Sequence, residues 1–225
     1  MNPIGFHLRT WASWTPDCGL DNTGALPALL RRRVTPLGRQ ALSAAWGLSK
    51  TESARLVFSS RHGEFSRTLS LLEAVANRTD LSPADFTLSV HHALVGLLSI
   101  AQGNHRGHTA VAAGSESFCF GLMEAAACLM ENPKEPVVFV HYDEPLPNLY
   151  ARFNETHTEA VALALTLSAT GEGEPIMFHS RCTPAGETRS ASHALDFLNF
   201  LTSGAIEGSS VGEHQQWLWT RHAVA

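Results

Sequence analysis

The turn that follows residues 108–113 carries the residues whose types and spacing best suit chemistry. The segment HTAVAA predicts a short apolar strand, Gly114-Ser115-Glu116-Ser117 predicts a tight turn, and residues 118–130 predict an apolar helix. A serine in such a turn stands at a helix N-terminus, where free N–H groups and the helix dipole favour developing negative charge. Ser115 is therefore a candidate nucleophile.

Ser115 also has a purely structural interpretation. The pattern G-x-S-x-G is absent, because Ala113 and Ser117 occupy the two glycine positions. A catalytic serine needs a base to activate it, and no neighbouring motif indicates one. Capping of the following helix by Ser115 or Ser117 is the alternative to catalysis.

The cysteines and histidines give little reason to expect a metal site or a disulfide framework. The four cysteines form no C-x-x-C pair: Cys18, Cys119, Cys128 and Cys182. His105 and His108 form H-x-x-H close to His91-His92, but structural zinc needs a second close pair of ligands. We expect no metal and no cofactor. Cys119, one turn into the predicted helix, is expected to be a buried structural thiol.

The elements that position this turn alternate between strands and helices. Strands are predicted at residues 4–11, 55–59, 108–113, 137–141, 159–169, 175–182 and 217–219, and helices at residues 35–48, 64–77, 93–102, 118–130 and 192–203. Thr35 and Pro36 predict the start of the first helix as cap and first residue. The unit at 108–141 predicts parallel strands joined by a right-handed crossover. The strands at 159–169 and 175–182 are predicted to pair as an antiparallel hairpin around Gly171-Glu172-Gly173. The predicted class is α/β, a mixed sheet covered by helices.

Composition excludes several classes of protein. The chain has 225 residues, a net charge of −5 and a hydrophobic fraction of 44%, which excludes a disordered chain and a basic nucleic-acid binder. No apolar run approaches the roughly 20 residues of a membrane span, and Met1 to Gly5 lack the pattern of a signal peptide. We therefore expect a cytoplasmic protein. Only 16% of residues are charged, which indicates either a weakly charged partner interface or a large core under a Ser/Thr/His-rich surface.

Several segments together resemble the amino-terminal half of β-ketoacyl synthases, which have the thiolase fold. The segments are Ser89-Val90-His91-His92 through Ile100, then Gly103, Gly107 and TAVAAGSESFCFGLMEAA from Thr109 to Ala126, with Leu29-Leu30-Arg31-Arg32-Arg33 and Pro36-Leu37-Gly38-Arg39 further upstream. Tyr142-Asp143-Glu144-Pro145-Leu146-Pro147 is similar to a short ketosynthase-like subfamily of aryl polyene biosynthesis clusters. The resemblance implies a thiolase-like fold and a single domain over 1–225. Its β-α-β core is expected over about 1–150, and a hairpin, helix and terminal strand over about 151–225.

Two departures from the family pattern bear on catalysis. Ser115 occupies the position of the family's nucleophilic cysteine, and the His-Gly-Thr-Gly-Thr-like segment of the second half is absent. Gly107-His108-Thr109 is only superficially similar to the family's later Gly-His-Thr segment. The chain thus resembles a chain length factor, a partner of a catalytic ketosynthase that is not catalytic alone. The implied partners are that ketosynthase and, through the complex, an acyl carrier protein.

The resemblance also implies which residues meet these partners. The strand with His108, Thr109 and Val111 is expected to pair antiparallel with its counterpart across the dimer. His62, Glu64, Phe86 and His91 are candidates for the floor of the partner's acyl tunnel, although each of them also suits ordinary packing or surface. The basic run Arg31-Arg32-Arg33 suits docking of an acidic carrier protein, or else a solvated face or ion pairs with the partner.

Two other functions remain open. The first is an independent acyltransferase or hydrolase that uses Ser115, with His108 or His62 as base. The second is a structural homodimer without acyl chemistry.

Overall fold

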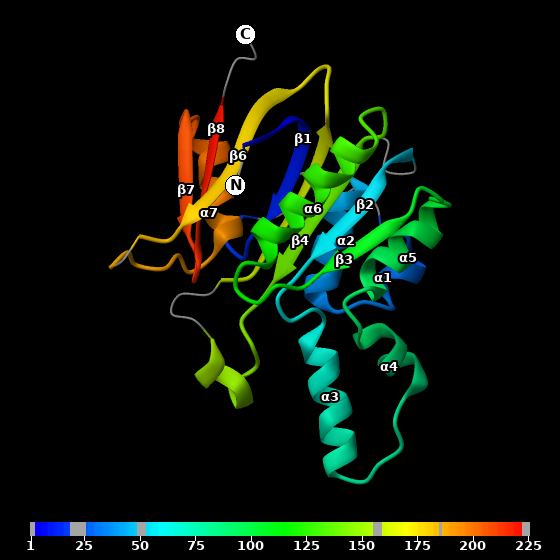
Figure 1. Cartoon of the computed structure of the whole chain (residues 1–225). Coiled ribbons are helices and arrows are strands. Elements are labelled where there is room, and N and C mark those ends of the chain that lie inside the picture. Colours follow the sequence, from blue (N-terminus) through cyan, green and yellow to red (C-terminus); the bar gives the residue numbers. More distant parts are fainter. Residues whose placement is uncertain (1–2, 19–25, 49–52, 155–158, 185, 222–225) are drawn as a thin grey trace.

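One mixed sheet organises the protein. The structure, a computed structural model, describes residues 3–18, 26–48, 53–154, 159–184 and 186–221. Within these ranges, eight strands lie in the order β3-β2-β4-β5-β1-β6-β8-β7 (Figure 1). The strands are β1 (Ile4–Trp14), β2 (Arg55–Ser59), β3 (His108–Val111), β4 (Val137–Asp143), β5 (Val161–Ser168), β6 (Glu174–Cys182), β7 (Glu207–Val211) and β8 (Gln215–Arg221). Strands β3, β2 and β4 are parallel to one another, and the other pairs are antiparallel. The predicted α/β class and mixed sheet are confirmed.

One face of the sheet is covered by α6 (Ser117–Glu131) and α7 (His193–Ser203). These helices pack on the aromatic side chains of the strands, and Phe118 of α6 contacts Phe139 and Phe197 at ring distances of 5.6 and 5.4 Å. Gly121 lets α6 approach closely, because a Cβ at this position would lie 2.6 Å from the Cβ of Ser59. The helix that follows the Ser115 turn is therefore held firmly against β2 and β4.

The other face is covered by α2 (Pro36–Trp46) and α5 (Ala93–Gln102), with the short α1 (Ala28–Arg31) beside α2. As predicted, Thr35 caps α2, and its side chain accepts a hydrogen bond from the Gly38 N–H at 3.1 Å. Gly103 ends α5 in the left-handed conformation, as glycine at that position permits. The two faces thus bury separate apolar clusters on either side of β2, β4 and β5.

The predicted hairpin of the fifth and sixth strands is wrong. Strand β1 lies between them and pairs antiparallel with both, so β5 and β6 run in the same direction. The chain crosses β1 near Arg9, where the β1–β5 register shifts between Leu8 and Thr10. Gly173 makes the crossing possible, since its φ is +129° and a Cβ there would lie 2.7 Å from the Leu8 carbonyl oxygen. The glycine-rich turn serves to pass over a strand rather than to reverse the chain beside it.

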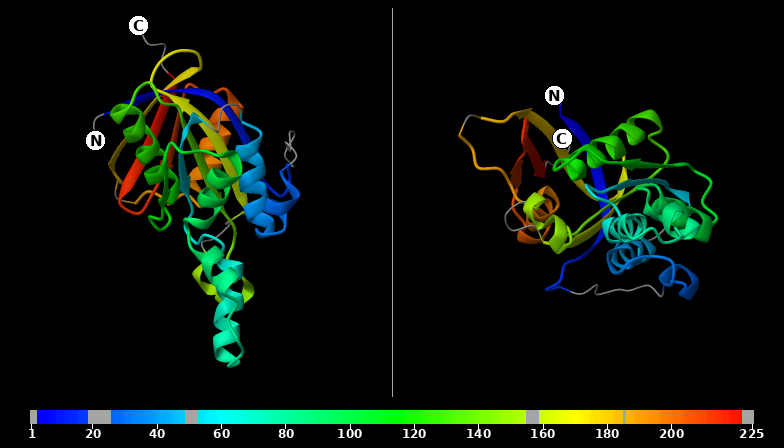
Figure 2. Two further views of the ribbon diagram at one scale, coloured as in Figure 1. Left: turned by 90° about the vertical axis from the view of Figure 1, so that its right-hand side faces the viewer. Right: turned by 90° about the horizontal axis from the view of Figure 1, so that it is seen from below.

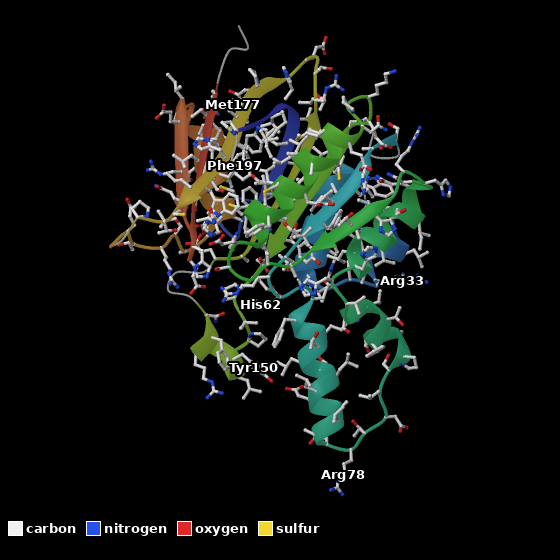
Figure 3. All side chains as sticks on the ribbon, in the orientation of Figure 1. Arg33, His62, Arg78, Tyr150, Met177 and Phe197 are labelled. Carbon is white, nitrogen blue, oxygen red and sulfur yellow. The ribbon has the colours of Figure 1, made fainter. Side chains whose placement is uncertain are left out.

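A helical arm projects from the sheet below the carboxyl end of β2. It consists of α3 (Phe65–Ala76) and α4 (Pro83–Ser89), and we call residues 65–89 the arm. It extends well away from the layers of the body (Figures 1 and 2), and Arg78 marks its tip (Figure 3). Neither arm helix buries a single residue. The short 3-10 helix η2 (Asn148–Phe153) lies beside the base of the arm, where Tyr150 contacts Phe65 edge-to-face at 5.1 Å.

The patterning of the sequence did not predict α1, α4, η2 or β7, all of which are short. Among the described residues, no single helix is long and apolar enough to cross a membrane. Helices α4 and α5 reach that length and composition only as a pair bent by 97°.

Candidate functional site

The Ser115 turn stands where the sequence places it, between β3 and α6. Gly114 has a φ of +61°, which turns the chain sharply after the strand. The Ser117 hydroxyl donates to the Gly114 carbonyl at 2.7 Å and accepts from the Ala113 N–H at 2.9 Å. Neither serine is the N-cap of α6, since that position is Glu116 and Ser117 is the first helical residue. The capping interpretation of these serines is therefore wrong, and Ser117 instead closes the turn.

Glu116 fastens this turn to the far end of the chain. Its side chain is 6% exposed and accepts hydrogen bonds from the indole N–H of Trp217 at 3.2 Å and from the backbone N–H of His214 at 3.3 Å. Gly212 leaves room for the carboxylate, because a Cβ there would lie 2.2 Å from its Oε1. The β7–β8 hairpin thus supports the turn that presents Ser115.

A pocket lined by both polar and apolar side chains opens beside Ser115. It lies between the ends of β3 and β4 and the start of α7. Its lining brings together Arg61, His62, Ser115, Phe118, His141, Asp143, Glu144, Phe153, Asn154, Glu159, Val161, Ala191, Ser192, His193 and Ala194.

Two polar groups of this pocket, His141 and Asp143, come from the end of β4. His141 Nδ1 lies 2.9 Å from the Ser59 hydroxyl, and His141 Nε2 lies 3.4 Å from Oδ2 of Asp143. Burial, with a smaller contribution from His193, lowers the pKa of His141 to about 3, so the ring is neutral near pH 7. Burial raises the pKa of Asp143 to about 6, although hydrogen bonds from Arg61, Ser60 and His62 oppose the shift.

A second buried histidine belongs to a chain of hydrogen bonds at the start of α7. His193 Nδ1 lies 2.5 Å from the Ser210 hydroxyl, which donates to Oδ2 of Asp196 at 2.5 Å. This chain ties α7 to β7 and fixes the orientation of the imidazole in the pocket wall.

The structure brings only one of the two predicted bases close to Ser115. His62 lines the same pocket. His108 lies at the opposite end of β3 and packs against His92 with a ring distance of 4.6 Å. Burial and the nearby His92 lower the pKa of His108. A base role for His108 at Ser115 is therefore wrong, because the length of the strand separates them.

The other tunnel candidates gather at the base of the arm and on α4. His91 Nε2 lies 3.4 Å from the Arg61 carbonyl oxygen, and its ring packs against Gly63. Phe86 is 64% exposed on α4. Glu64 is only 2% exposed: it accepts from the Thr35 hydroxyl and pairs with Arg67 at 3.7 Å. Burial raises the pKa of Glu64. Glu64 thus connects α2 to α3 within the chain.

A second hollow follows the edge of the sheet, and we call it the edge groove. It runs beside β3 and the outer face of α6 and has an empty volume of about 550 Å³. Its lining is Val111, Ala113, Phe120, Met123, Glu124 and Ala127. Of the predicted edge residues, Val111 lines this groove, and His108 and Thr109 lie further back on the strand, where each is half-buried.

The basic run Arg31-Arg32-Arg33 and the thiol of Cys119 line neither the pocket beside Ser115 nor the edge groove. Arg31, Arg32 and Arg33 are exposed, and the Arg33 carbonyl accepts a hydrogen bond from Arg67 at 2.8 Å. Cys119 is fully buried, and this burial raises the pKa of its thiol well above the usual value. Within the described ranges, no three His, Cys, Asp or Glu side chains are arranged to hold a metal ion.

Sequence reasoning missed His141, Asp143 and His193 as pocket residues. A signal existed for the first two, because VVFVH is a buried strand whose polar residues follow at its carboxyl end, where parallel strands present functional side chains. His193 follows the helix cap Ser192 and has no comparable signal.

Several solved structures that are similar to this chain contain ketosynthases. One is a ketosynthase (ApeO) in complex with its chain length factor (ApeC) from Xenorhabdus doucetiae, with a TM-score of 0.85, 25% identity, and coverage of 97% of this chain and 100% of that chain. Another is the ishigamide ketosynthase/chain length factor, with a TM-score of 0.60, 15% identity and coverage of 90% and 74%. A third is a type II PKS acyl-carrier protein in complex with its ketosynthase bound to the hexaketide, with a TM-score of 0.64, 12% identity and coverage of 80% and 70%.

None of the curated proteins matches this sequence. The family model of the beta-ketoacyl synthase N-terminal domain matches residues 9–220, which is nearly all of the sheet and both helical layers. This chain therefore belongs to the family of the beta-ketoacyl synthase N-terminal domain.

Proposed function

We propose that this chain is the non-catalytic chain length factor of a β-ketoacyl-ACP synthase heterodimer. It pairs with a catalytic ketosynthase in the cytoplasm and shapes the acyl tunnel used in aryl polyene biosynthesis, a polyketide- and fatty-acid-like route. The ketosynthase supplies the nucleophile for condensation of carrier-protein thioesters. The observation that carries this proposal is the edge strand β3 beside the apolar edge groove.

Strand β3 has one side available for pairing. The carbonyls of Gly107 and Val111 accept from the N–H groups of Leu56 and Ser60, both at 3.2 Å, so these residues point toward β2. Alternation along the strand points the backbone groups of Ala110 away from β2. A strand edge of this kind next to apolar side chains is a template for a partner strand.

The Ser115 site supports a role without catalysis. Both ring nitrogens of His141 lie close to other partners, Ser59 and Asp143, and the neutral ring with its low pKa is a poor base. The Cys119 thiol lies on the buried side of α6 and its pKa is raised well above the usual value, so it does not form a thiolate near pH 7.

The similar structures agree with a partner subunit. The Xenorhabdus doucetiae complex contains a ketosynthase and its chain length factor, and the matched chain is covered along its whole length. The arm then supplies the residues that reach the partner's tunnel, chiefly Phe86, with His62 and His91 at its base. Glu64 acts through the connection of α2 to α3. The exposed Arg31-Arg32-Arg33 run is placed to attract an acidic carrier protein.

Co-purification of this chain with a co-expressed catalytic ketosynthase of the same source tests the proposal. Ala110→Pro removes an outward N–H without touching a bond to β2, and it is expected to abolish the heterodimer in size-exclusion chromatography. Ala110→Val keeps the N–H and is the matched control, which is expected to bind. A heterodimer that forms equally well with Ala110→Pro would contradict pairing through β3. A wild-type chain that stays a homodimer and ignores the ketosynthase would contradict the chain length factor itself.

Thioester hydrolysis at Ser115 is the second candidate function, because Ser115 and His62 line one pocket. Ser115→Ala distinguishes the two functions. We expect the variant to leave condensation by the complex unchanged and the chain alone to show no thioesterase activity. Hydrolysis of an acyl-thioester by the isolated chain, lost in Ser115→Ala and in His62→Gln, would favour the hydrolase instead.

A further inference from the structure

One of the two connections between the arm and the body is a short loop that one carboxylate holds; the other is residues 90–92, which lead into α5. The loop, residues 60–63, connects the end of β2 to α3. Asp143 at the end of β4 accepts from the Arg61 N–H at 2.9 Å, from the Ser60 hydroxyl at 3.0 Å and from the His62 N–H at 3.3 Å. Three donors from consecutive residues therefore converge on one side chain of another strand.

The loop closes on itself around the same contact. The Ser60 hydroxyl that donates to Asp143 also accepts from the Gly63 N–H at 2.6 Å. Gly63 has a φ of +61°, a conformation that suits glycine, and it packs against the ring of His91. Because α3 begins two residues later at Phe65, the direction in which the arm leaves the body depends on this turn.

His141 fixes the carboxylate from the other side. His141 Nδ1 lies 2.9 Å from the Ser59 hydroxyl and Nε2 lies 3.4 Å from Oδ2 of Asp143, so the ring stands between β2 and the carboxylate. The Asp143 side chain, at the end of β4, is thus held by the 60–63 loop on one side and by His141 on the other, which restricts its rotamer.

Few other contacts fasten the arm. Within the described residues, its helices bury nothing, and the links to the body include those of Glu64 with Thr35, Arg67 with the Arg33 carbonyl, Phe65 with Tyr150, and α4 with α5. Arg67 also pairs with Asp85, so α3 and α4 move as one unit. Because residues 90–92 attach the other end of the arm to α5, a change in the 60–63 loop would alter the tilt of the arm between its two connections and so displace Phe86.

We propose that Asp143 is a positioning residue for product length, which sets the angle of the arm through the 60–63 loop. This inference rests on the proposed function, because the arm is taken to reach the tunnel of a partner ketosynthase. Asp143 itself touches no substrate. It acts through the residues that the arm presents.

The test uses the complex of this chain with its ketosynthase, carrier protein and malonyl-carrier substrate. Asp143→Asn keeps the shape but loses one acceptor oxygen, and Asp143→Ala loses both. Glu207→Gln changes an exposed carboxylate on β7, outside the pocket and the arm, and is the control. We expect the distribution of product lengths to shift most in Asp143→Ala, less in Asp143→Asn and not at all in Glu207→Gln. Hydrogen exchange of the Arg61 and His62 amides should become about tenfold faster or more in Asp143→Ala, since their hydrogen bonds to a charged acceptor are lost.

The outcomes separate this inference from the proposed function. Faster loop exchange with unchanged product lengths and an intact complex would overturn the role of Asp143 and leave the chain length factor in place. A product spectrum that does not depend on this chain at all would overturn the proposed function. If Asp143→Ala fails to fold, Ser60→Ala removes one donor and the acceptor of Gly63, and its product lengths decide in the same way.

Discussion

Helices α6 and α3 have similar lengths and different surroundings. Helix α6 buries nine of its 15 residues between the sheet and α7, whereas α3 buries none of its 12. Both carry many apolar side chains, but those of the arm stay in contact with solvent: Leu72 is 47% exposed, Val75 59% and Phe86 64%. Exposed apolar patches of this kind mark interaction surfaces.

The difference teaches that stability and interaction are assigned to separate parts of the chain. The body holds its own core and positions the turn and the pocket. The arm gains little from folding against the body, so its apolar residues are available to a partner. Changes in the body should then alter unfolding, and changes in the arm should alter binding or product with little effect on unfolding.

Phe139→Ala is the substitution expected to have the largest effect. Its ring is fully buried on β4 against Phe118, so truncation should cost about 3–5 kcal/mol of unfolding free energy. Urea denaturation measures this cost. Leu72→Ala in the arm is the control and should stay within about 0.5 kcal/mol of the wild type. Equal losses in both variants would mean that the arm belongs to the core.

The pH dependence of the unfolding free energy tests the body of the protein separately from the arm, because it depends on the buried His141. Its pKa falls from 6.5 to about 3 on folding, so only the unfolded chain takes up a proton as the pH drops below 6.5. Stability due to this group is therefore lost on acidification, by about 2 kcal/mol at pH 5. Asp143 acts with the opposite sign, since folding raises its pKa to about 6.

Urea unfolding at pH 7.5 and pH 5 should show this contribution as a difference between wild type and His141→Gln. The variant should lose about 2 kcal/mol less on acidification, whatever its stability at pH 7.5. The contribution of Asp143 is present in both chains. His105→Gln, which removes an exposed histidine, is the control, and an equal pH response in all three chains would refute the assignment.

The sequence predicts the local elements of the body well and their arrangement less well. Thr35-Pro36 marks the start of α2 because capping is a local interaction. The pairing of β5 and β6 with β1 could not be predicted from local sequence, since the paired residues are at least 148 positions apart, as for Trp14 and Ala162. The same reason explains why only part of the site could be predicted. The turn sequence indicates Ser115, but His141 and His193 come close to it only through the order of the strands and the position of the start of α7.

One helix in the body and one in the arm begin with the same pattern, a hydroxyl residue followed by proline, so their caps allow a direct comparison of the two regions. Thr35-Pro36 begins α2, and Ser82-Pro83 begins α4, where the Ser82 hydroxyl accepts from the Asp85 N–H at 3.2 Å. Thr35→Ala should cost about 1–2 kcal/mol in urea unfolding, because the cap and a donor to the buried Glu64 are both lost. Ser82→Ala should leave global unfolding nearly unchanged and appear only as faster hydrogen exchange in α4. A global loss of equal size in Ser82→Ala would show that the arm unfolds with the body.

Phe86→Glu should have the smallest effect on stability and a clear effect on function. The ring is exposed, so a carboxylate in its place should change the unfolding free energy by less than about 0.5 kcal/mol. If this position contacts a partner's apolar tunnel, binding would require desolvation of the new carboxylate, and the free energy of that desolvation strongly disfavours the complex. Urea unfolding measures the effect on stability, and size-exclusion chromatography with product analysis of the reconstituted complex measures the effect on function.

Asp80→Asn, in the loop between the two arm helices, is the control and should change neither stability nor function. A Phe86→Glu chain that gives the wild-type complex and product would show that α4 does not meet the tunnel, and the arm would then need another partner for its exposed apolar side chains.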